Sequence, residues 1–125
     1  MSAQPETIKI VNPFSEYLRY QGWHVKKTHG NQYTAGWPDL YCMHPSYTPR
    51  WVECKINYDG QIHVTPDQMA ELPKWIAHGC YFWVIVGHDF RGLSGKAELH
   101  RAYQKLFGKP NGHLLFHPST RRLLV

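Results

Sequence analysis

The sequence has no apolar stretch long enough to cross a bilayer, because its longest apolar run, from Tyr81 to Val86, has the length of one β-strand. The N-terminal residues also lack the charged and apolar blocks of a signal peptide. We therefore expect an intracellular, cytoplasmic protein without a membrane partner. Cysteines are few, and an odd number cannot all pair within one chain. Because each lies among strand-forming residues, we expect buried, reduced thiols at Cys42, Cys54 and Cys80.

Acidic residues are also scarce. The chain has 9 Asp and Glu against 14 Lys and Arg, which gives a formal net charge of +5, and it has 9 histidines in addition. A basic balance favours a polyanionic partner, of which nucleic acid is the commonest. The 125 residues are 42% hydrophobic and 14% aromatic, without internal repeats or linkers. This composition predicts one globular domain over residues 1–125.

Apolar periodicity and capping residues predict alternating helices and strands. Asn12 suits the start of a helix, after a loose lead-in over residues 1–11. Thr65 and Gln68 have the spacing of a capping box at the start of a second helix, and Pro73 predicts a kink within it. The other expected elements are a third helix over 94–107 and strands over 23–28, 39–43, 50–56, 81–86 and 114–116.

The order of these elements predicts an α/β fold with a single mixed β-sheet flanked by helices. The two central strands, 39–43 and 50–56, are expected to pair as a hairpin. Their connection, with the sequence His-Pro-Ser-Tyr-Thr-Pro, is expected to be too long for a two-residue turn.

Three charged residues occupy these central strands. Side chains alternate along a strand, so Glu53 and Lys55 share one face, and the apolar residues between them face the other side. Asp39 can approach Glu53 from the neighbouring strand. Two half-buried carboxylates repel each other unless a cation lies between them, and magnesium prefers such oxygen ligands. Lys55 would then hold an attacking water or neutralise charge growing on a phosphate, which is the chemistry of phosphodiester hydrolysis.

The same residues resemble a known signature. Pro38-Asp39 followed by Glu53-Cys54-Lys55 is similar to the PD-(D/E)xK motif of the restriction-endonuclease-like nucleases. The wider pattern, Gly-Trp-Pro-Asp-Leu, then Val-Glu-Cys-Lys, then Thr-Pro-Asp-Gln, resembles most the small stand-alone VRR-NUC domains. The resemblance covers about residues 12–87, which would form the nuclease core, and leaves 88–125 as a C-terminal extension without an assigned role.

The resemblance implies a restriction-endonuclease-like core and magnesium- or manganese-dependent cleavage of DNA. It implies that Asp39, Glu53 and the backbone carbonyl of Cys54 bind the metal, with Lys55 as the catalytic lysine. Gln68 would match a catalytic-site glutamine, and Glu16 an acidic metal ligand of the first helix. Stand-alone members resemble homodimeric resolvases, so the expected substrate is branched DNA of the Holliday-junction type and the expected assembly is a homodimer.

Simpler interpretations exist for several of these residues. Glu53 and Lys55 could be a surface cross-strand pair on an edge strand. Gln68 would reach the N-cap in any capping box, and the helix dipole favours an acid such as Glu16 in a first helical turn. Zinc is a further alternative, because cysteine and histidine lie two residues apart at positions 42 and 44 and at positions 78 and 80.

Contacts to DNA are expected from basic residues near these strands, and Trp37 and Trp51 could line the active cleft. The candidate residues for DNA binding are Lys26, Lys27, Arg50 and His63, with Arg19, Arg121 and Arg122 as further possibilities. Two rival functions remain open. One is a nuclease of the same chemistry directed at flaps, nicks or single strands, and the other is a nucleic-acid-binding module without catalysis.

Overall fold

The computed structural model describes residues 6–28, 32–89, 91–117 and 119–124. It contains one mixed sheet of four strands in the order β1 (His24–Lys27), β2 (Leu40–His44), β3 (Tyr47–Asn57) and β4 (Trp83–His88). The first three strands pair antiparallel, and β3 and β4 pair parallel. The predicted α/β class, with a single mixed sheet and flanking helices, is thereby confirmed.

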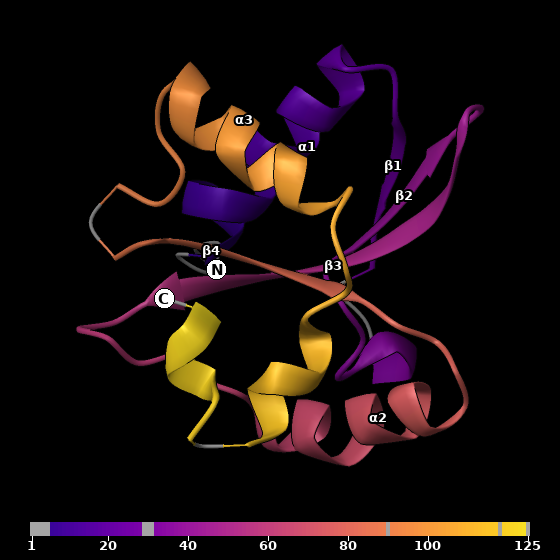
Figure 1. Ribbon diagram of the computed structural model, residues 1–125, viewed down its shortest axis with the longest axis vertical. Helices are drawn as coiled ribbons and strands as arrows, with labels where there is room; N and C mark the ends of the chain where they lie inside the picture. The colour runs from indigo at the N-terminus through magenta and orange to yellow at the C-terminus, as the bar shows by residue number, and fades with distance from the viewer. Residues whose placement is uncertain (1–5, 29–31, 90, 118, 125) are drawn as a thin grey trace.

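Helical segments cover both faces of the sheet, giving three layers (Figure 1). On one face, Val52, Cys54 and Ile56 of β3 belong to a buried cluster with residues of α1 (Asn12–Tyr20) and α3 (Lys96–Lys105). On the other face lie α2 (Pro66–Ala77) and the 3-10 helices η3 (Gly112–Phe116) and η4 (Arg121–Leu124). The buried clusters therefore draw residues from both sides of the 12–87 segment. None of the helices in the described part of the chain is both long and apolar enough to span a membrane.

The start of α2 follows from its local sequence. The Thr65 hydroxyl accepts a hydrogen bond from the Gln68 backbone, and the Gln68 side chain accepts one from the Thr65 backbone, so both halves of the predicted capping box form. The helix continues through Pro73 to Ala77. Its first turn also contacts the loop before β2. Gly36 has a φ of 82°, and a Cβ there would lie 2.5 Å from the Asp67 carbonyl oxygen, so this close approach requires glycine.

The expected loose lead-in is wrong for the part of residues 1–11 that the structure describes. Residues Thr7–Val11 form a π-helical turn, η1, that continues directly into α1, and Ile10 and Val11 are buried. Asn12 is therefore inside a continuous helical segment, and its side chain accepts a hydrogen bond of 2.6 Å from the Lys27 ammonium instead of capping the helix. Burial of the two apolar side chains extends the helix toward the N-terminus.

Two further expectations differ from the structure. The β2–β3 connection is a two-residue turn at positions 45 and 46, because β3 already begins at Tyr47. The apolar run at 114–116 lies in the 3-10 helix η3 and does not form a strand. Asn111 explains this, since its side-chain amide bonds both the N–H of Val84 at 2.7 Å and the carbonyl of Val84 at 3.3 Å. The amide thus occupies backbone groups of β4 that a further strand would need.

Candidate active site

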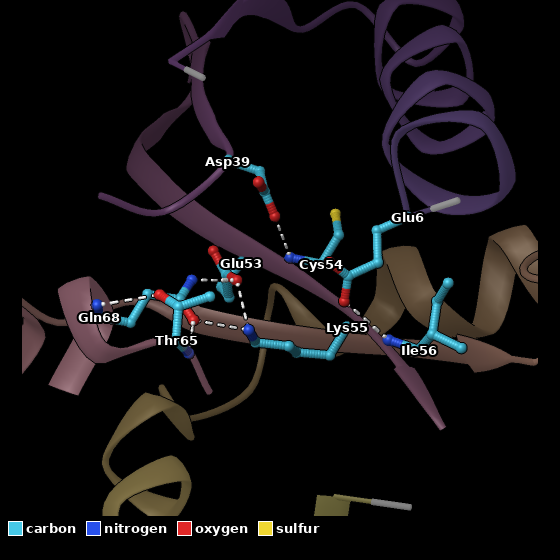
Figure 2. Close-up of polar contacts among 8 residues, drawn as sticks. All are labelled: Glu6, Asp39, Glu53, Cys54, Lys55, Ile56, Thr65 and Gln68. Atoms are coloured by element: carbon cyan, nitrogen blue, oxygen red, sulfur yellow. Dashed lines mark hydrogen bonds and ion pairs between the residues drawn. The ribbon is translucent and has the colours of Figure 1, made fainter. Parts of the chain in front are cut away.

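The candidate site lies where β2 separates from β3. The pairing of these strands ends at Leu40 and Val52, so the next backbone N–H groups along this edge of β3 have no strand partner. Carboxylates replace the missing strand: Asp39 Oδ2 accepts a hydrogen bond of 2.8 Å from the Cys54 N–H, and Glu6 Oε2 accepts one of 3.3 Å from the Ile56 N–H. Figure 2 shows both acidic side chains reaching toward β3. Two acids are thereby fixed beside the strand that carries Glu53.

Glu53, Lys55 and Gln68 form a buried network. The Lys55 ammonium lies 3.1 Å from Glu53 Oε2 and donates a 2.7 Å hydrogen bond to Gln68 Oε1. The Gln68 amide in turn donates a 2.6 Å hydrogen bond to Glu53 Oε2. In Figure 2 the Lys55 side chain reaches toward both partners. Glu53 and Lys55 are each only 2% exposed, so the interpretation as a surface cross-strand pair is wrong.

Gln68 belongs both to the predicted capping box and to the buried network, and its catalytic role stays a prediction. Its Oε1 accepts from the backbone N–H of Thr65, as a capping box requires, and also from Lys55. Because α2 begins at this point, the cap places the amide over the face of β3 that carries Glu53. The capping motif is therefore also what positions Gln68 in the site.

A cavity of about 230 Å³ opens onto these groups. Asp39, Glu53 and Lys55 all line it, with Gln68 and Thr65 from the start of α2 on one side. The remaining wall residues, from the N-terminal segment and the loop before β2, are Glu6, Thr34, Ala35, Gly36 and Trp37. The structure thus brings together the four side chains that the sequence nominated as catalytic.

The predicted metal ligand Glu16 is not among the wall residues of this cavity and lies exposed on α1. The acidic residue that the N-terminal helical segment brings to the cavity is Glu6. Sequence reasoning missed Glu6 because it placed residues 1–11 outside the folded core. A signal was present, since Ile10, Phe14 and Leu18 recur at every fourth position and predict a helix that begins before Asn12.

Burial makes the ionised carboxylates costly. Burial, and after it the neighbouring Asp39 charge, raise the pKa of Glu53 to about 8 against the opposing effect of Lys55. Burial likewise raises the pKa of Asp39 to about 6, although the Cys54 N–H favours the ionised form. Burial also raises the pKa of Glu6 above its ordinary value. The site therefore concentrates negative charge that either protons or a cation must neutralise.

One oxygen of Glu53 is available for such a cation. Oε1 of Glu53 is buried and has no hydrogen-bond donor among the described residues, whereas Oε2 has both Lys55 and Gln68. An orphaned carboxylate oxygen beside a second carboxylate fits a hard divalent cation. The N–H and C=O of one strand residue in an antiparallel ladder point to the same edge, so the Cys54 carbonyl also faces the gap beside Asp39.

In the part of the chain that the structure describes, the cysteines and histidines considered for zinc do not gather into a site. Within the described ranges, no group of three or more His, Cys, Asp or Glu side chains has the arrangement of an all-side-chain metal site. Cys42 and Cys54 are buried, free thiols on the α1 and α3 face of the sheet, and burial raises the pKa of Cys42 to about 12. Two carboxylates with a backbone carbonyl remain the ligand set that the site offers.

The candidate DNA-binding residues fall on different faces. Lys26 pairs with Tyr41, which pairs with Trp51, so Lys26 shares the sheet face of Glu53. Lys27 is on the opposite face, where it bonds to Asn12. His63 is exposed and near enough to Glu6 to lower the pKa of that carboxyl.

Arg50 is a poor candidate for contacting DNA at this cavity. Arg50 is three positions before Glu53 on β3, so its side chain lies on the other face of the sheet. There its guanidinium donates to the Leu106 carbonyl and lies over the Trp83 ring. Among the further possibilities, Arg19 and Arg121 donate to backbone carbonyls of Val25 and Leu115. The side chain of Arg122 lies outside the described residues.

Comparison with known proteins adds no family assignment, since neither protein-family models nor curated proteins match the chain.

Proposed function

We propose that this chain is a divalent-metal-dependent endonuclease of the PD-(D/E)xK type that hydrolyses phosphodiester bonds in DNA. The observation that carries the proposal is the convergence of the Asp39 carboxylate, the Glu53 carboxylate and the Lys55 ammonium on one cavity. Their order along the chain and their resemblance to the VRR-NUC motif support it. The mixed sheet with helices on both faces is compatible with a restriction-endonuclease-like core.

Asp39, Glu53 and the Cys54 carbonyl would hold Mg²⁺ or Mn²⁺. When bound, the ion supplies charge to polarise a phosphoryl oxygen and to stabilise the pentavalent transition state. The protein's part is to keep the ligands rigid. The Cys54 N–H fixes Asp39, and Gln68 fixes Glu53 through Oε2, so that Oε1 remains directed at the site.

Lys55 is positioned for contact with the reacting phosphate. An ammonium has three N–H groups, and among the described residues Glu53 and Gln68 provide acceptors for two of them. The remaining N–H can donate to a phosphate oxygen or hold the attacking water. In the hydrolysis, the water loses one proton as its oxygen forms a new bond to phosphorus, one P–O ester bond breaks, and the leaving oxygen gains one proton.

The proposed substrate is branched DNA, and the proposed assembly is a homodimer. The described part of the chain brings Asp39, Glu53 and Lys55 together at one cavity, so paired cuts in the two strands of a junction would use two copies. The net charge of +5 favours DNA, and Lys26 on the site face supplies a contact for the phosphate backbone.

The test is cleavage of four-way junction, flap, single-stranded and duplex DNA with Mg²⁺ or EDTA. We expect metal-dependent cleavage by the wild-type chain, and a loss of about 100-fold or more in Asp39→Asn and Lys55→Met. Asp59→Asn is the matched control. It makes the same charge change at an exposed loop position with φ of 53°, a conformation that asparagine tolerates.

The two other functions make different predictions for the same assays. Preferential cleavage of a flap, a nick or a single strand would identify that DNA as the substrate and leave the proposed chemistry unchanged. Metal-independent, salt-sensitive binding without cleavage of any substrate would favour a non-catalytic module. Equal cleavage by the wild-type chain and Asp39→Asn would overturn the proposed mechanism.

A further inference from the structure

A second cavity, of about 440 Å³, lies beside the first on the α2 side of the sheet. Its walls include three half-exposed indoles, those of Trp37, Trp51 and Trp75. Trp37 also lines the cavity that holds Asp39 and Glu53, so the two cavities share a wall. From this placement we propose that the aromatic cavity binds an unpaired nucleobase next to the phosphate that is cut. The proposal rests on the proposed nuclease function and specifies its substrate.

The three indoles are arranged to receive a flat ring. Their centroids lie 4.9 to 6.0 Å apart, and the planes of each pair meet at 68° to 89°. Each pair meets edge to face, and Tyr41 also packs on Trp51 with ring centroids 4.4 Å apart, so the ring surface left for a further aromatic group is the half-exposed part of each indole that lines the cavity. Trp75 is held in place by a hydrogen bond of 3.1 Å from its N–H to the Glu71 carboxylate. This bond orients the Trp75 ring within the aromatic cluster.

The charges around the cavity suit a nucleotide. Lys74 and His78 belong to its rim, and Lys26 lies on the same sheet face as Trp51. Glu71 is the acidic residue of the wall, and its carboxylate accepts from Trp75. Indole faces bind any base through its π system, and cations bind the phosphates on either side of it. An apolar peptide would use the indoles and would have no use for the adjoining carboxylates and lysine of the first cavity.

The shared wall determines which nucleotide is held. The base and phosphate of one nucleotide are joined through a single sugar, so a base on Trp37 has a neighbouring phosphate in or beside the first cavity. A base inside a duplex must break its pairing and stacking to enter, whereas an unpaired base avoids most of that cost. The preferred DNA therefore carries an unpaired nucleotide at the cut, as at a flap, a bulge or the crossover of a junction.

The test is a double-mutant cycle of DNA affinity that combines one change in the DNA with one change in the protein, measured in EDTA so that no cleavage occurs. One arm replaces the unpaired nucleotide of a bulged duplex with an abasic nucleotide, and the other arm uses Trp75→Leu, which removes the π face and retains an apolar side chain. We expect each change alone to weaken binding about ten-fold or more. The two losses should not add, because both remove the same contact. Trp75→Phe should restore most of the affinity.

The control variant is Tyr20→Leu, which removes an aromatic residue that is 80% exposed on α1, away from the cavity. It should bind both DNAs as the wild-type chain does. Circular dichroism and urea unfolding of Trp75→Phe and Trp75→Leu establish that both variants fold. Equal losses on base-containing and abasic DNA, or full additivity, would overturn the proposal. A change in sedimentation of Trp75→Leu without base-dependent binding would instead assign the cavity to contact between two copies.

Failure of the nuclease proposal gives a different result. If the wild-type chain cleaves no DNA but shows the base-dependent cycle, the aromatic site stands and catalysis is absent. If cleavage depends on Asp39 and Lys55 but the cycle shows no coupling, the nuclease proposal stands and the aromatic site is wrong.

Discussion

Metal binding at this site should release protons in an amount set by the two buried carboxyls. Burial raises the pKa of Glu53 to about 8 and that of Asp39 to about 6. At pH 7 without metal, Glu53 is therefore mostly neutral and Asp39 mostly ionised. Together they hold about one proton, which a divalent cation must displace because it binds the ionised forms. At pH 9 both are mainly ionised, and the release should fall to about 0.1 proton.

The assay is isothermal titration of the chain with Mn²⁺ in two buffers of different ionisation enthalpy, at pH 7 and at pH 9. The difference between the observed enthalpies gives the number of protons released for each ion bound. Glu53→Gln should abolish most of the release at pH 7, and Asp59→Asn should leave it unchanged. Binding of Mn²⁺ at pH 7 without proton release would refute the reasoning, since it would mean that the cation does not displace the proton from Glu53.

The same groups predict how stability varies with pH. Both carboxyls have a higher pKa in the folded protein than in the unfolded chain, so between these pKa values the folded state binds more protons than the unfolded state does. In EDTA, the free energy of unfolding should therefore fall as pH rises from about 4 to about 8. Added Mn²⁺ should reduce this fall, because it stabilises the ionised forms.

Three substitutions test the supporting structure. Lys55→Met removes the partner of the buried Glu53 carboxylate. By urea unfolding in EDTA, we expect the free energy of unfolding to fall by about 3 kcal/mol at pH 9, and by less at pH 6, where Glu53 is neutral. Gln68→Leu should cost about 1–3 kcal/mol in the same assay and slow cleavage, because it removes the hydrogen bonds to Glu53, Lys55 and the helix cap; unchanged cleavage would exclude a positioning role. Gly36→Ala should destabilise more than Gly79→Ala, since both have a positive φ but only at Gly36 does the new Cβ meet a carbonyl oxygen at 2.5 Å; equal losses would exclude the clash.

The parts of the fold that depend on residues close together in the sequence were predictable from it. The start of α2 follows from Thr65 and Gln68, because a capping box involves four consecutive residues. The side of β3 that carries Glu53 and Lys55 follows from strand alternation. Alternation also shows that Arg50, which shares the parity of Val52, belongs on the opposite face. Its nomination for DNA binding overlooked that signal.

The remaining differences come from contacts between distant segments. The 114–116 run satisfies the pattern of a strand, but Asn111 occupies the Val84 backbone groups of β4 that a further strand would need. Glu6 reaches Ile56 across 50 positions of sequence, and no local pattern specifies that hydrogen bond. Trp37 lies in the loop before β2, Trp51 in β3 and Trp75 in α2, so the sequence indicates aromatic residues near the charged positions but not their shared cavity.

The most direct test is a crystal of the chain soaked in Mn²⁺, with the ion located by anomalous scattering. The account predicts one peak within about 2.2 Å of an oxygen of Asp39 and also of Oε1 of Glu53. A peak that touches only one of these carboxylates, or that lies outside the cavity they line, would contradict it.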